Sequence, residues 1–371
     1  MKITFVLPGY PYKPVGGFRI VYLYANYFAQ QGHEVSVVHG LKRGSLREPP
    51  PMWPKSLRIG WRKILYTTRA FNPPKVRWQS VDTRVNLLYV PGDPVADHVP
   101  DGDIVIATAW WTAEYVMQYP PSKGRKFYLI QHWETWGGPE DRVKNTWFLP
   151  MTKVVISHWL QDLGTNIGAT DVHYIPNAID LTLFRVTNTM DQRPPAIVAL
   201  YHAATWKGSH DAIDALSIIH DRYPTVRLTM FGTTRPEKPL PQWLDFVLNP
   251  SGETLVALYN AHSIYVSASH AEGWGLPPAE AMACGCAFVG TDIGGHKEFA
   301  IHGDTALLSP IQDPPKLAAN VSRLIENPWL LRQYQQRGHQ NIQQFTWDKS
   351  GQAFLNLLLN SVTYGENVES S

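Results

Sequence analysis

Residues 272–285 read Glu-Gly-Trp-Gly-Leu-Pro-Pro-Ala-Glu-Ala-Met-Ala-Cys-Gly. Two glutamates, Glu272 and Glu280, stand eight positions apart and are joined by a glycine-rich turn and a helix start. The two prolines predict the entry into the helix, and Gly285 predicts its end. We therefore expect Glu280 in the first helical turn, beside the free backbone N–H groups and the positive end of the helix dipole.

The chemistry suited to this stretch is the binding of a diphosphate and a sugar. Gly273 and Gly275 let backbone approach a ligand without interference from a Cβ atom. Backbone N–H groups at a helix start bind anions, and carboxylates accept hydrogen bonds from pairs of sugar hydroxyls. The alternative is a capped structural helix with an incidental acid, which leaves most of the pattern unexplained.

Outward from this stretch, the chain alternates apolar runs with helical patterns in two series. The first 40 residues predict a strand over Ile3–Leu7, a loop over Pro8–Gly17, a helix, and a strand over Glu34–His39. Further strands are expected at Val85–Tyr89, Ile104–Thr108, Lys126–Gln131 and Lys153–Ser157, then at Ala196–Tyr201, Arg227–Phe231, Ser263–Ser267 and Ala287–Thr291. Helices are expected at Asp211–His220 and Ser350–Leu359.

This order predicts an α/β protein of two Rossmann-like, doubly wound domains with an interdomain cleft. The length of 371 residues allows two domains. We place the N-terminal domain at 1–176, the C-terminal domain at 177–349, and a C-terminal helix that packs back on the N-terminal domain, followed by a frayed tail, at 350–371. Because open parallel sheets bind ligands at the carboxyl ends of their strands, we expect the site between the halves.

The stretch Glu272–Gly285 resembles the signature of the retaining GT-B glycosyltransferases whose hallmark is Glu, seven residues, Glu (glycosyltransferase family 4, glycosyl transferases group 1). The resemblance implies that Glu272 faces the donor sugar as a catalytic residue and that Glu280 binds the nucleotide ribose. It assigns the intervening Gly273, Trp274, Gly275 and Leu276 to the donor as well. It extends over most of the chain, through Val289–Gly295 and Pro176–Asp180, and is absent between residues 42 and 100.

Lys207, followed by Gly208 between a strand and a helix, resembles the phosphate-binding lysine of that family. A lysine at the β-phosphate neutralises charge on the leaving diphosphate, and such electrostatic effects are often the largest in catalysis. A solvated loop lysine is the plainer interpretation. Many family members carry an arginine about six positions earlier, where this chain has Tyr201 and His202. Either His202 or backbone N–H groups would then supply the second phosphate contact.

Gly16, Gly17 and His132 are the candidate site residues of the N-terminal half. A glycine-rich helix start offers N–H groups to an anion, and the family uses this loop near the donor phosphate. His132 follows a predicted strand at its carboxyl end and resembles a histidine that the family places near the reactive carbon of the sugar. A structural histidine is the equally weighted alternative.

The formal net charge of +2 conceals a basic stretch in the first quarter of the chain. Between Lys42 and Arg77 ten basic residues face one acid, Glu48, and tryptophans are interleaved with them. This pattern favours an anionic partner, such as a lipid pyrophosphate, a charged glycan or a membrane surface, over a nucleic acid, for which no motif is present. We assign Arg58, Arg62 and Lys63 to acceptor or membrane binding; a solvated loop is the alternative.

Other features bound the chemistry. No metal site and no cofactor are expected, because Asp101-Gly102-Asp103, the one sequence like a metal-binding DxD motif, falls in a turn before a strand. Cys284 and Cys286 are too close for an unstrained disulfide, so buried thiols in a cytoplasmic protein are expected. Peripheral association with the inner face of an anionic membrane is an option that the basic stretch adds.

Together these features predict a metal-independent enzyme of polysaccharide biosynthesis, a retaining hexosyl- or deoxyhexosyltransferase. It would move a sugar from a nucleotide-diphosphate sugar to a glycan, lipid-linked or small-molecule acceptor. The alternatives are a non-catalytic scaffold that binds nucleotide-sugars and a GT-B epimerase. A dinucleotide-binding dehydrogenase is excluded, because no Gly-x-Gly-x-x-Gly follows the first strand.

Overall fold

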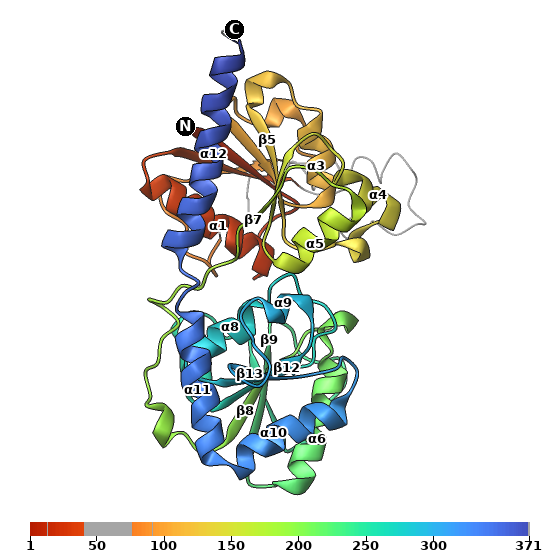
Figure 1. Ribbon diagram of the computed structural model, residues 1–371, viewed down its shortest axis with the longest axis vertical. Helices are drawn as coiled ribbons and strands as arrows, with labels where there is room; N and C mark the ends of the chain where they lie inside the picture. The colour runs from red at the N-terminus through yellow and green to blue at the C-terminus, as the bar shows by residue number, and fades with distance from the viewer. Residues whose placement is uncertain (13, 41–75, 91, 370–371) are drawn as a thin grey trace, which may run out of the picture. The chain divides into compact units, whose positions relative to one another are not determined.

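The computed structural model describes residues 1–12, 14–40, 76–90 and 92–369. They form two compact units, each an α/β layered structure (Figure 1). Unit 1 comprises Met1–Ile156, Leu160–Ile175 and Gly351–Ser371, and unit 2 comprises Ser157–Trp159 and Pro176–Ser350. The chain thus enters unit 2 for three residues before its main crossing at Pro176.

Unit 1 is built on a parallel sheet of seven strands in the order β3-β2-β1-β4-β5-β6-β7. The strands are β1 (Lys2–Leu7), β2 (Glu34–Gly40), β3 (Asn86–Val90), β4 (Ile104–Ala107), β5 (Arg125–Ile130), β6 (Thr152–Val155) and β7 (Val172–Tyr174). The central strands are almost wholly buried, as expected of a sheet covered by helices on both faces.

The helices of unit 1 are α1 (Gly16–Gln30), α3 (Trp110–Met117), α4 (Glu140–Thr146), and the greater parts of α5 (His158–Ile167) and α12 (Trp347–Glu369). Figure 1 shows α1 and α12 on one face of the sheet and α3, α4 and α5 on the other. Helix α12 packs on α1, since the ring of Phe354 lies 5.1 Å from that of Tyr24 and 5.7 Å from that of Phe28. The last helix therefore belongs to the core of the unit that the first strand begins.

Unit 2 is a parallel sheet of six strands in the order β10-β9-β8-β11-β12-β13. The strands are β8 (Ala196–Leu200), β9 (Arg227–Gly232), β10 (Leu244–Leu248), β11 (Ile264–Ser267), β12 (Ala287–Thr291) and β13 (Ala306–Ser309). The helices are α6 (Ser209–Arg222), α7 (Glu253–Asn260), α8 (Leu276–Ala283), α9 (Gly294–Lys297), α10 (Pro314–Glu326) and α11 (Pro328–Ile342). Helix α6 packs with α10, and α8 packs with α11. Short 3-10 turns elsewhere in the two units are η1 (Ala96–His98), η2 (Pro121–Lys123), η3 (Thr135–Gly137), η4 (Met190–Gln192) and η5 (Thr205–Lys207).

The predicted fold, two doubly wound α/β sheets, is confirmed, and the expected strands occur within one or two residues of their predicted ends. Three strands were not predicted: β7, β10 and β13, each at the edge of its sheet. The helix expected at Ser350–Leu359 is longer and begins at Trp347. Edge strands are short and partly exposed, as β7 and β10 show, so their apolar runs are weak signals.

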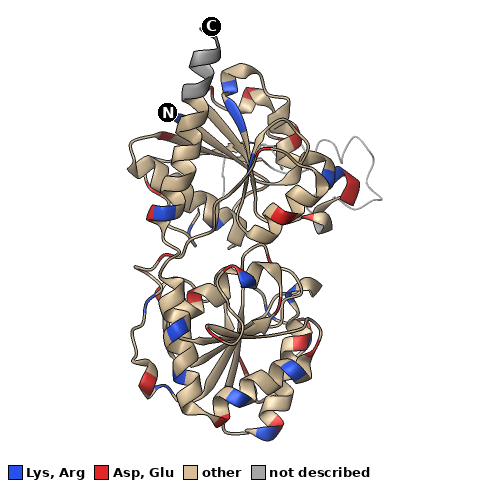
Figure 2. Cartoon of the chain, in the orientation of Figure 1, with Lys and Arg blue, Asp and Glu red and all other residues tan. Residues whose placement is uncertain are grey.

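Three further properties follow from the described residues. Cys284 and Cys286 are buried free thiols, as expected, and burial raises the pKa of Cys286 to about 12 and that of Cys284 further. Basic and acidic residues are interspersed on the helices of unit 2 (Figure 2). In the part of the chain that the structure describes, no helix is both long enough and apolar enough to cross a bilayer.

Candidate functional site

Each sheet reverses its strand order once, between β1 and β4 in unit 1 and between β8 and β11 in unit 2. Open α/β sheets bind ligands at the carboxyl ends of the strands that flank such a reversal. In unit 2 the two loops at this point are residues 201–208, after β8, and residues 268–275, after β11. They contain six of the fourteen candidate residues that the sequence indicated: His202, Lys207, Glu272, Gly273, Trp274 and Gly275.

Lys207 and Glu272 come together at this point as an ion pair, with 2.7 Å between Nζ and Oε2. Ser269 donates a hydrogen bond from Oγ to the other carboxylate oxygen, Oε1, at 3.0 Å. Burial raises the pKa of Glu272, but the charge and hydrogen bond of Lys207, the nearby His296 and the Ser269 hydrogen bond outweigh it. The pKa lies below its usual value, so Glu272 is ionised at neutral pH.

The two loops that carry this pair are joined through their backbones. Gly208 has φ +61°, and a Cβ atom there would lie 1.9 Å from the carbonyl oxygen of Ala268. The backbone N–H of His270 donates to the carbonyl of Trp206 at 2.7 Å. The His270 ring is paired with Asp211 of α6, with 2.6 Å between Nε2 and Oδ2. The positions of Lys207 and Glu272 are therefore set by backbone packing as well as by their own contact.

The turn after Glu272 presents a run of backbone N–H groups. For Gly273, Trp274, Gly275 and Leu276, no acceptor is found among the residues that the structure describes. Gly275 has φ +104°, which favours glycine. Trp274 as a whole is only 2% exposed and its ring packs against Phe299, so its side chain is not available to a ligand. Successive free N–H groups of this kind form an anion-binding concavity.

Glu280 lies deeper than its sequence position predicted. Helix α8 begins at Leu276, one residue before the first proline, so Glu280 is its fifth residue and the expected place in the first turn is wrong by one position. The residue is 3% exposed. Its charge, added to burial, raises the pKa values of Tyr259 and Tyr265. Helix α8 ends at Ala283, and Gly285 follows with φ +85°, as predicted.

His202 has a defined tautomer when its ring is neutral. Its Nδ1 accepts a hydrogen bond from the backbone N–H of Ala204 at 3.0 Å, which leaves the proton on Nε2. Its own backbone N–H donates to Ser209 Oγ at 2.9 Å. Desolvation and the charge of Lys207 lower the pKa of His202, although Glu272 opposes them. His202 is thus a neutral donor at neutral pH, in the same loop as Lys207.

In unit 1 the candidates Gly16, Gly17 and His132 lie together. Gly16 begins α1, and the side chain of Gln131 donates from Nε2 to the carbonyl oxygen of Gly17 at 3.1 Å. A Cβ atom on Gly17 would lie 3.2 Å from that nitrogen. His132 follows Gln131 at the carboxyl end of β5, and its Nδ1 accepts the backbone N–H of Trp133 at 2.8 Å. The start of α1 and the end of β5 therefore form one edge of unit 1.

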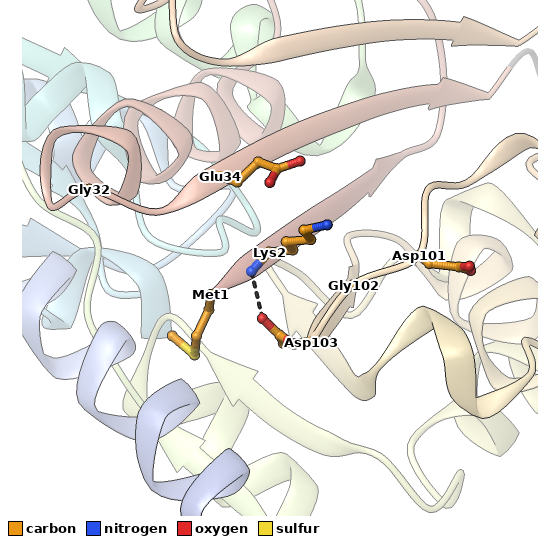
Figure 3. A pocket seen from close by; sticks show the side chains of 7 residues that line it. All are labelled: Met1, Lys2, Gly32, Glu34, Asp101, Gly102 and Asp103. Carbon is orange, nitrogen blue, oxygen red and sulfur yellow. Dashed lines mark hydrogen bonds between the residues drawn. The ribbon is translucent and has the colours of Figure 1, made fainter.

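The remaining candidates lie elsewhere. Arg58, Arg62 and Lys63 fall outside the described residues. Asp101 and Asp103 lie at the amino ends of β1 and β4, where they line an open pocket with Met1, Lys2, Gly32, Gly102 and Glu34 (Figure 3). Asp103 accepts the backbone N–H of Lys2 at 2.7 Å and thereby holds the turn, as expected. This pocket is at the opposite end of the unit 1 strands from Gly16, Gly17 and His132.

In the described ranges no group of three or more His, Cys, Asp or Glu side chains is arranged to hold an ion. The sequence-based expectation that activity needs no metal stays a prediction.

Several residues of the site were not indicated by the sequence. Ser269 could have been found, because it precedes Glu272 by three positions in the same loop. His296 donates from Nδ1 to the carbonyl of Thr291 at 2.8 Å and is fully buried near Glu272. Trp159 donates from Nε1 to the carbonyl oxygen of Gly273 at 3.0 Å. Nothing local in the sequence marks the last two, because their partners come from distant segments.

Comparison with known proteins places this geometry in context. Residues 195–327, most of unit 2, match the family model described as Glycosyl transferases group 1. A D-inositol 3-phosphate glycosyltransferase of Streptomyces bingchenggensis is 31% identical over 101 residues, which are 27% of this chain and 22% of the relative. A glycogen synthase of Mycobacterium tuberculosis is 29% identical over 175 residues, 43% of this chain and 41% of the relative. The matches thus span about a fifth to two fifths of the relatives' length.

Solved structures resemble the whole chain. The sucrose-phosphate synthase of Thermosynechococcus elongatus covers 100% of this chain, which covers 100% of it, with a TM-score of 0.69 and 18% identity. HepE of Anabaena, solved in complex with UDP and glucose, covers 97% of this chain, which covers 100% of it, with a TM-score of 0.72 and 16% identity. At these identities the likeness concerns the fold, two parallel α/β sheets of the GT-B type.

Proposed function

Since this chain carries the group 1 glycosyltransferase domain on a GT-B fold, we propose that it is a retaining glycosyltransferase that uses a nucleotide-diphosphate sugar as donor. The acceptor is a glycan, a lipid-linked glycan or a small molecule. The observation that carries the proposal is the ion pair of Lys207 and Glu272 beside the four backbone N–H groups of residues 273–276. A cation, a carboxylate and an anion-binding turn are the groups that a diphosphate-linked sugar needs.

In this proposal unit 2 holds the donor. The diphosphate lies on the N–H groups of residues 273–276, and Lys207 neutralises the charge that grows on it as the glycosidic bond breaks. His202 supplies a neutral Nε2–H as a second phosphate contact, in place of the arginine that this chain lacks at this point. Glu272 faces the donor sugar, and Glu280 accepts hydrogen bonds from the ribose hydroxyls.

Lys207 changes partners when the donor binds. Among the described residues, the one carboxylate that pairs with its ammonium group is that of Glu272, and both side chains are largely shielded, at 24% and 11% exposed. A phosphate takes part of the Lys207 charge and leaves Glu272 able to accept a hydrogen bond from a sugar hydroxyl. The acceptor hydroxyl then enters on the face that the diphosphate leaves, so the configuration at the anomeric carbon is retained.

Unit 1 is proposed to bind the acceptor. Gly16 and Gly17 offer the start of α1 to donor phosphate and acceptor, and His132 lies near the reactive carbon. The basic stretch with Arg58, Arg62 and Lys63 draws an anionic acceptor or membrane surface. The protein is proposed to act in the cytoplasm in polysaccharide biosynthesis, with peripheral attachment to the inner face of the membrane as the alternative.

The test begins with binding. Melting temperature is measured with UDP-, GDP- and dTDP-sugars, with UDP-glucose first because HepE was solved with UDP and glucose. A ligand at 100 times its Kd stabilises by about 2.7 kcal/mol, which is readily seen. The donor that binds is then incubated with candidate acceptors, and the anomeric configuration of the product is read by NMR.

Each outcome decides between functions. Transfer with the anomeric configuration of the donor supports the proposal, and transfer with inversion overturns the retaining assignment. Conversion of the nucleotide-sugar without an acceptor indicates the epimerase. Binding without any turnover indicates a nucleotide-sugar-binding scaffold, and no binding of any nucleotide-sugar removes the proposal altogether.

A further inference from the structure

The three residues Ser157–Trp159 are counted with unit 2, although the chain on both sides of them belongs to unit 1. Two of them form hydrogen bonds with unit 2, one to the turn that follows Glu272 and the other to Glu298. Trp159 donates from Nε1 to the carbonyl oxygen of Gly273 at 3.0 Å. His158 donates its backbone N–H to Oε1 of Glu298 at 2.6 Å, and its Nδ1 lies 3.2 Å from Oε2. Because the Glu298 side chain is only 2% exposed, this anchor is firm.

The indole ring is also enclosed by backbone. A Cβ atom on Gly294, the first residue of α9, would lie 2.4 Å from Cγ of Trp159. A Cβ atom on Gly295 would lie 2.5 Å from the carbonyl oxygen of Glu272. Because neither glycine has a Cβ atom, the ring of Trp159 packs closely against Gly294 and the backbone of Glu272 packs closely against Gly295. Trp159, Glu272 and the start of α9 are packed as one group.

The hydrogen bond to Gly273 has a consequence for the anion-binding turn. A trans peptide is planar, so its carbonyl oxygen and its N–H point in opposite directions. When Trp159 holds the oxygen of the Gly273–Trp274 peptide, the N–H of Trp274 points away from the indole. That N–H is one of the four without an acceptor among the described residues. Glycine has little intrinsic preference between peptide orientations, so a lock on this peptide matters more than elsewhere.

We propose that Trp159 is a positioning residue: its indole N–H fixes the Gly273–Trp274 peptide so that the Trp274 N–H meets the diphosphate of the donor. This inference rests on the proposed function, since it assigns the ligand of the turn. Trp159 touches neither the diphosphate nor the sugar. Its effect is confined to ligands that carry a diphosphate, because the ribose and base are bound elsewhere.

The test uses Trp159→Phe, which keeps a ring against Gly294 and removes the N–H. Dissociation constants are measured by calorimetry for UDP, GDP and dTDP and for the corresponding monophosphates. For the diphosphate that binds the wild type, Kd is expected to rise about tenfold, whereas the monophosphate is expected to bind as before. Trp243→Phe is the matched control, because Trp243 stacks on His220 in the same unit, away from the turn.

A second variant reaches the same peptide without altering Trp159. Gly294→Ala places a methyl group against the indole and displaces it, so it is expected to show the same selective loss of diphosphate binding, with a lower melting temperature. Equal affinity of Trp159→Phe and wild type for the diphosphate overturns the inference and leaves the proposed function standing. An equal loss for diphosphate and monophosphate also overturns it. No binding of any nucleotide by the wild type overturns both.

Discussion

The carboxyl edges of the two sheets differ in the kind of group that holds them. In unit 2 ionisable side chains meet one another, Lys207 with Glu272 and His270 with Asp211, on loops that are already joined through backbone. In unit 1 the corresponding edge is held by neutral contacts, such as Gln131 on the carbonyl of Gly17. A charged, preassembled edge suits a class of ligands that all carry the same group, such as the diphosphate of nucleotide-sugars. A neutral edge leaves more of its recognition to neighbouring segments.

Even the acid nearest to the unit 1 edge is used structurally. Glu134 has φ +49°, and its Oε2 accepts the backbone N–H of Trp110 at the start of α3 at 2.8 Å. Burial, the Lys207 charge and hydrogen bonds act on Glu272 instead, which is a carboxylate placed at a reversal of strand order. An acid near the end of a strand therefore indicates a functional site only when its hydrogen-bond or ion-pair partner is known.

The largest effect is expected from breaking the charged edge of unit 2. Lys207→Met and Glu272→Gln should each lower turnover about a thousandfold, because each removes charge that acts on the reacting groups. Lys207→Met should also lower the melting temperature, since it leaves a shielded carboxylate unpaired, and the pKa of Glu272 should then rise. Steady-state rates and thermal unfolding measure the two effects.

The double variant Lys207→Met/Glu272→Gln separates catalysis from stability. It removes both charges, so the melting temperature should recover while turnover stays lost. Arg337→Met is the control, because Arg337 and Asp304 form an exposed ion pair in the same unit at 2.7 Å. Recovery of turnover in the double variant would show that the pair is structural only.

The next effect tests the part of unit 1 that the sequence alone describes. Reversal of charge at Arg58, Arg62 and Lys63 together should weaken binding to anionic vesicles or to an anionic acceptor by about 3 kcal/mol, at about 1 kcal/mol per residue, which is roughly a hundredfold. The loss should shrink as salt is raised. Donor affinity should be unchanged. Loss of donor affinity with intact vesicle and acceptor binding would show that the basic stretch binds the donor and not the acceptor or the membrane.

A smaller effect is expected at the nucleotide. Glu280→Gln should raise the KM for the donor about tenfold and change kcat little, because the role proposed for the side chain is to hold ribose rather than the reacting centre. Glu253→Gln is the control, an exposed acid with only a long 3.5 Å contact to Arg185. A large fall in kcat with unchanged KM would place Glu280 at the reacting carbon instead.

Removal of divalent metal ions is expected to have no effect on activity. Activity measured with EDTA should equal activity measured with Mn²⁺, because in the proposed function Lys207 and the backbone N–H groups of residues 273–276 take the place of a divalent ion at the diphosphate. Activity that disappears with EDTA and returns with Mn²⁺ contradicts this prediction and removes the contrast with metal-dependent sites.

Much of the charged edge of the unit 2 sheet could be predicted, because its residues lie in short contiguous stretches of the sequence. Glu272 and Glu280 share one turn and one helix, and Lys207 follows a strand that periodicity reveals. Helix α10 was not predicted, although Asp313 precedes two prolines and accepts the N–H of Lys316 as a helix cap. The role of Trp159 could not be predicted, because 114 residues separate it from Gly273, and a contact over that distance depends on packing that no local pattern encodes.

The depth of Glu280 illustrates the same limit within one helix. The prolines located the helix, but the exact first residue and the side of the helix that is buried depend on the strands behind it. His202 is the intermediate case. Its place before Lys207 was evident, whereas its tautomer came from the N–H of Ala204, two residues along a loop whose shape the sequence does not specify.

The buried thiols of Cys284 and Cys286 make this chain its own unfolding reporter. They are the only cysteines in the sequence, and both belong to unit 2. Alkylating reagents attack the thiolate, so shielded thiols with raised pKa values react only when the surrounding structure opens. Labelling by N-ethylmaleimide therefore times the opening of unit 2 alone, and protection by a nucleotide would map its binding to that unit without any engineered probe.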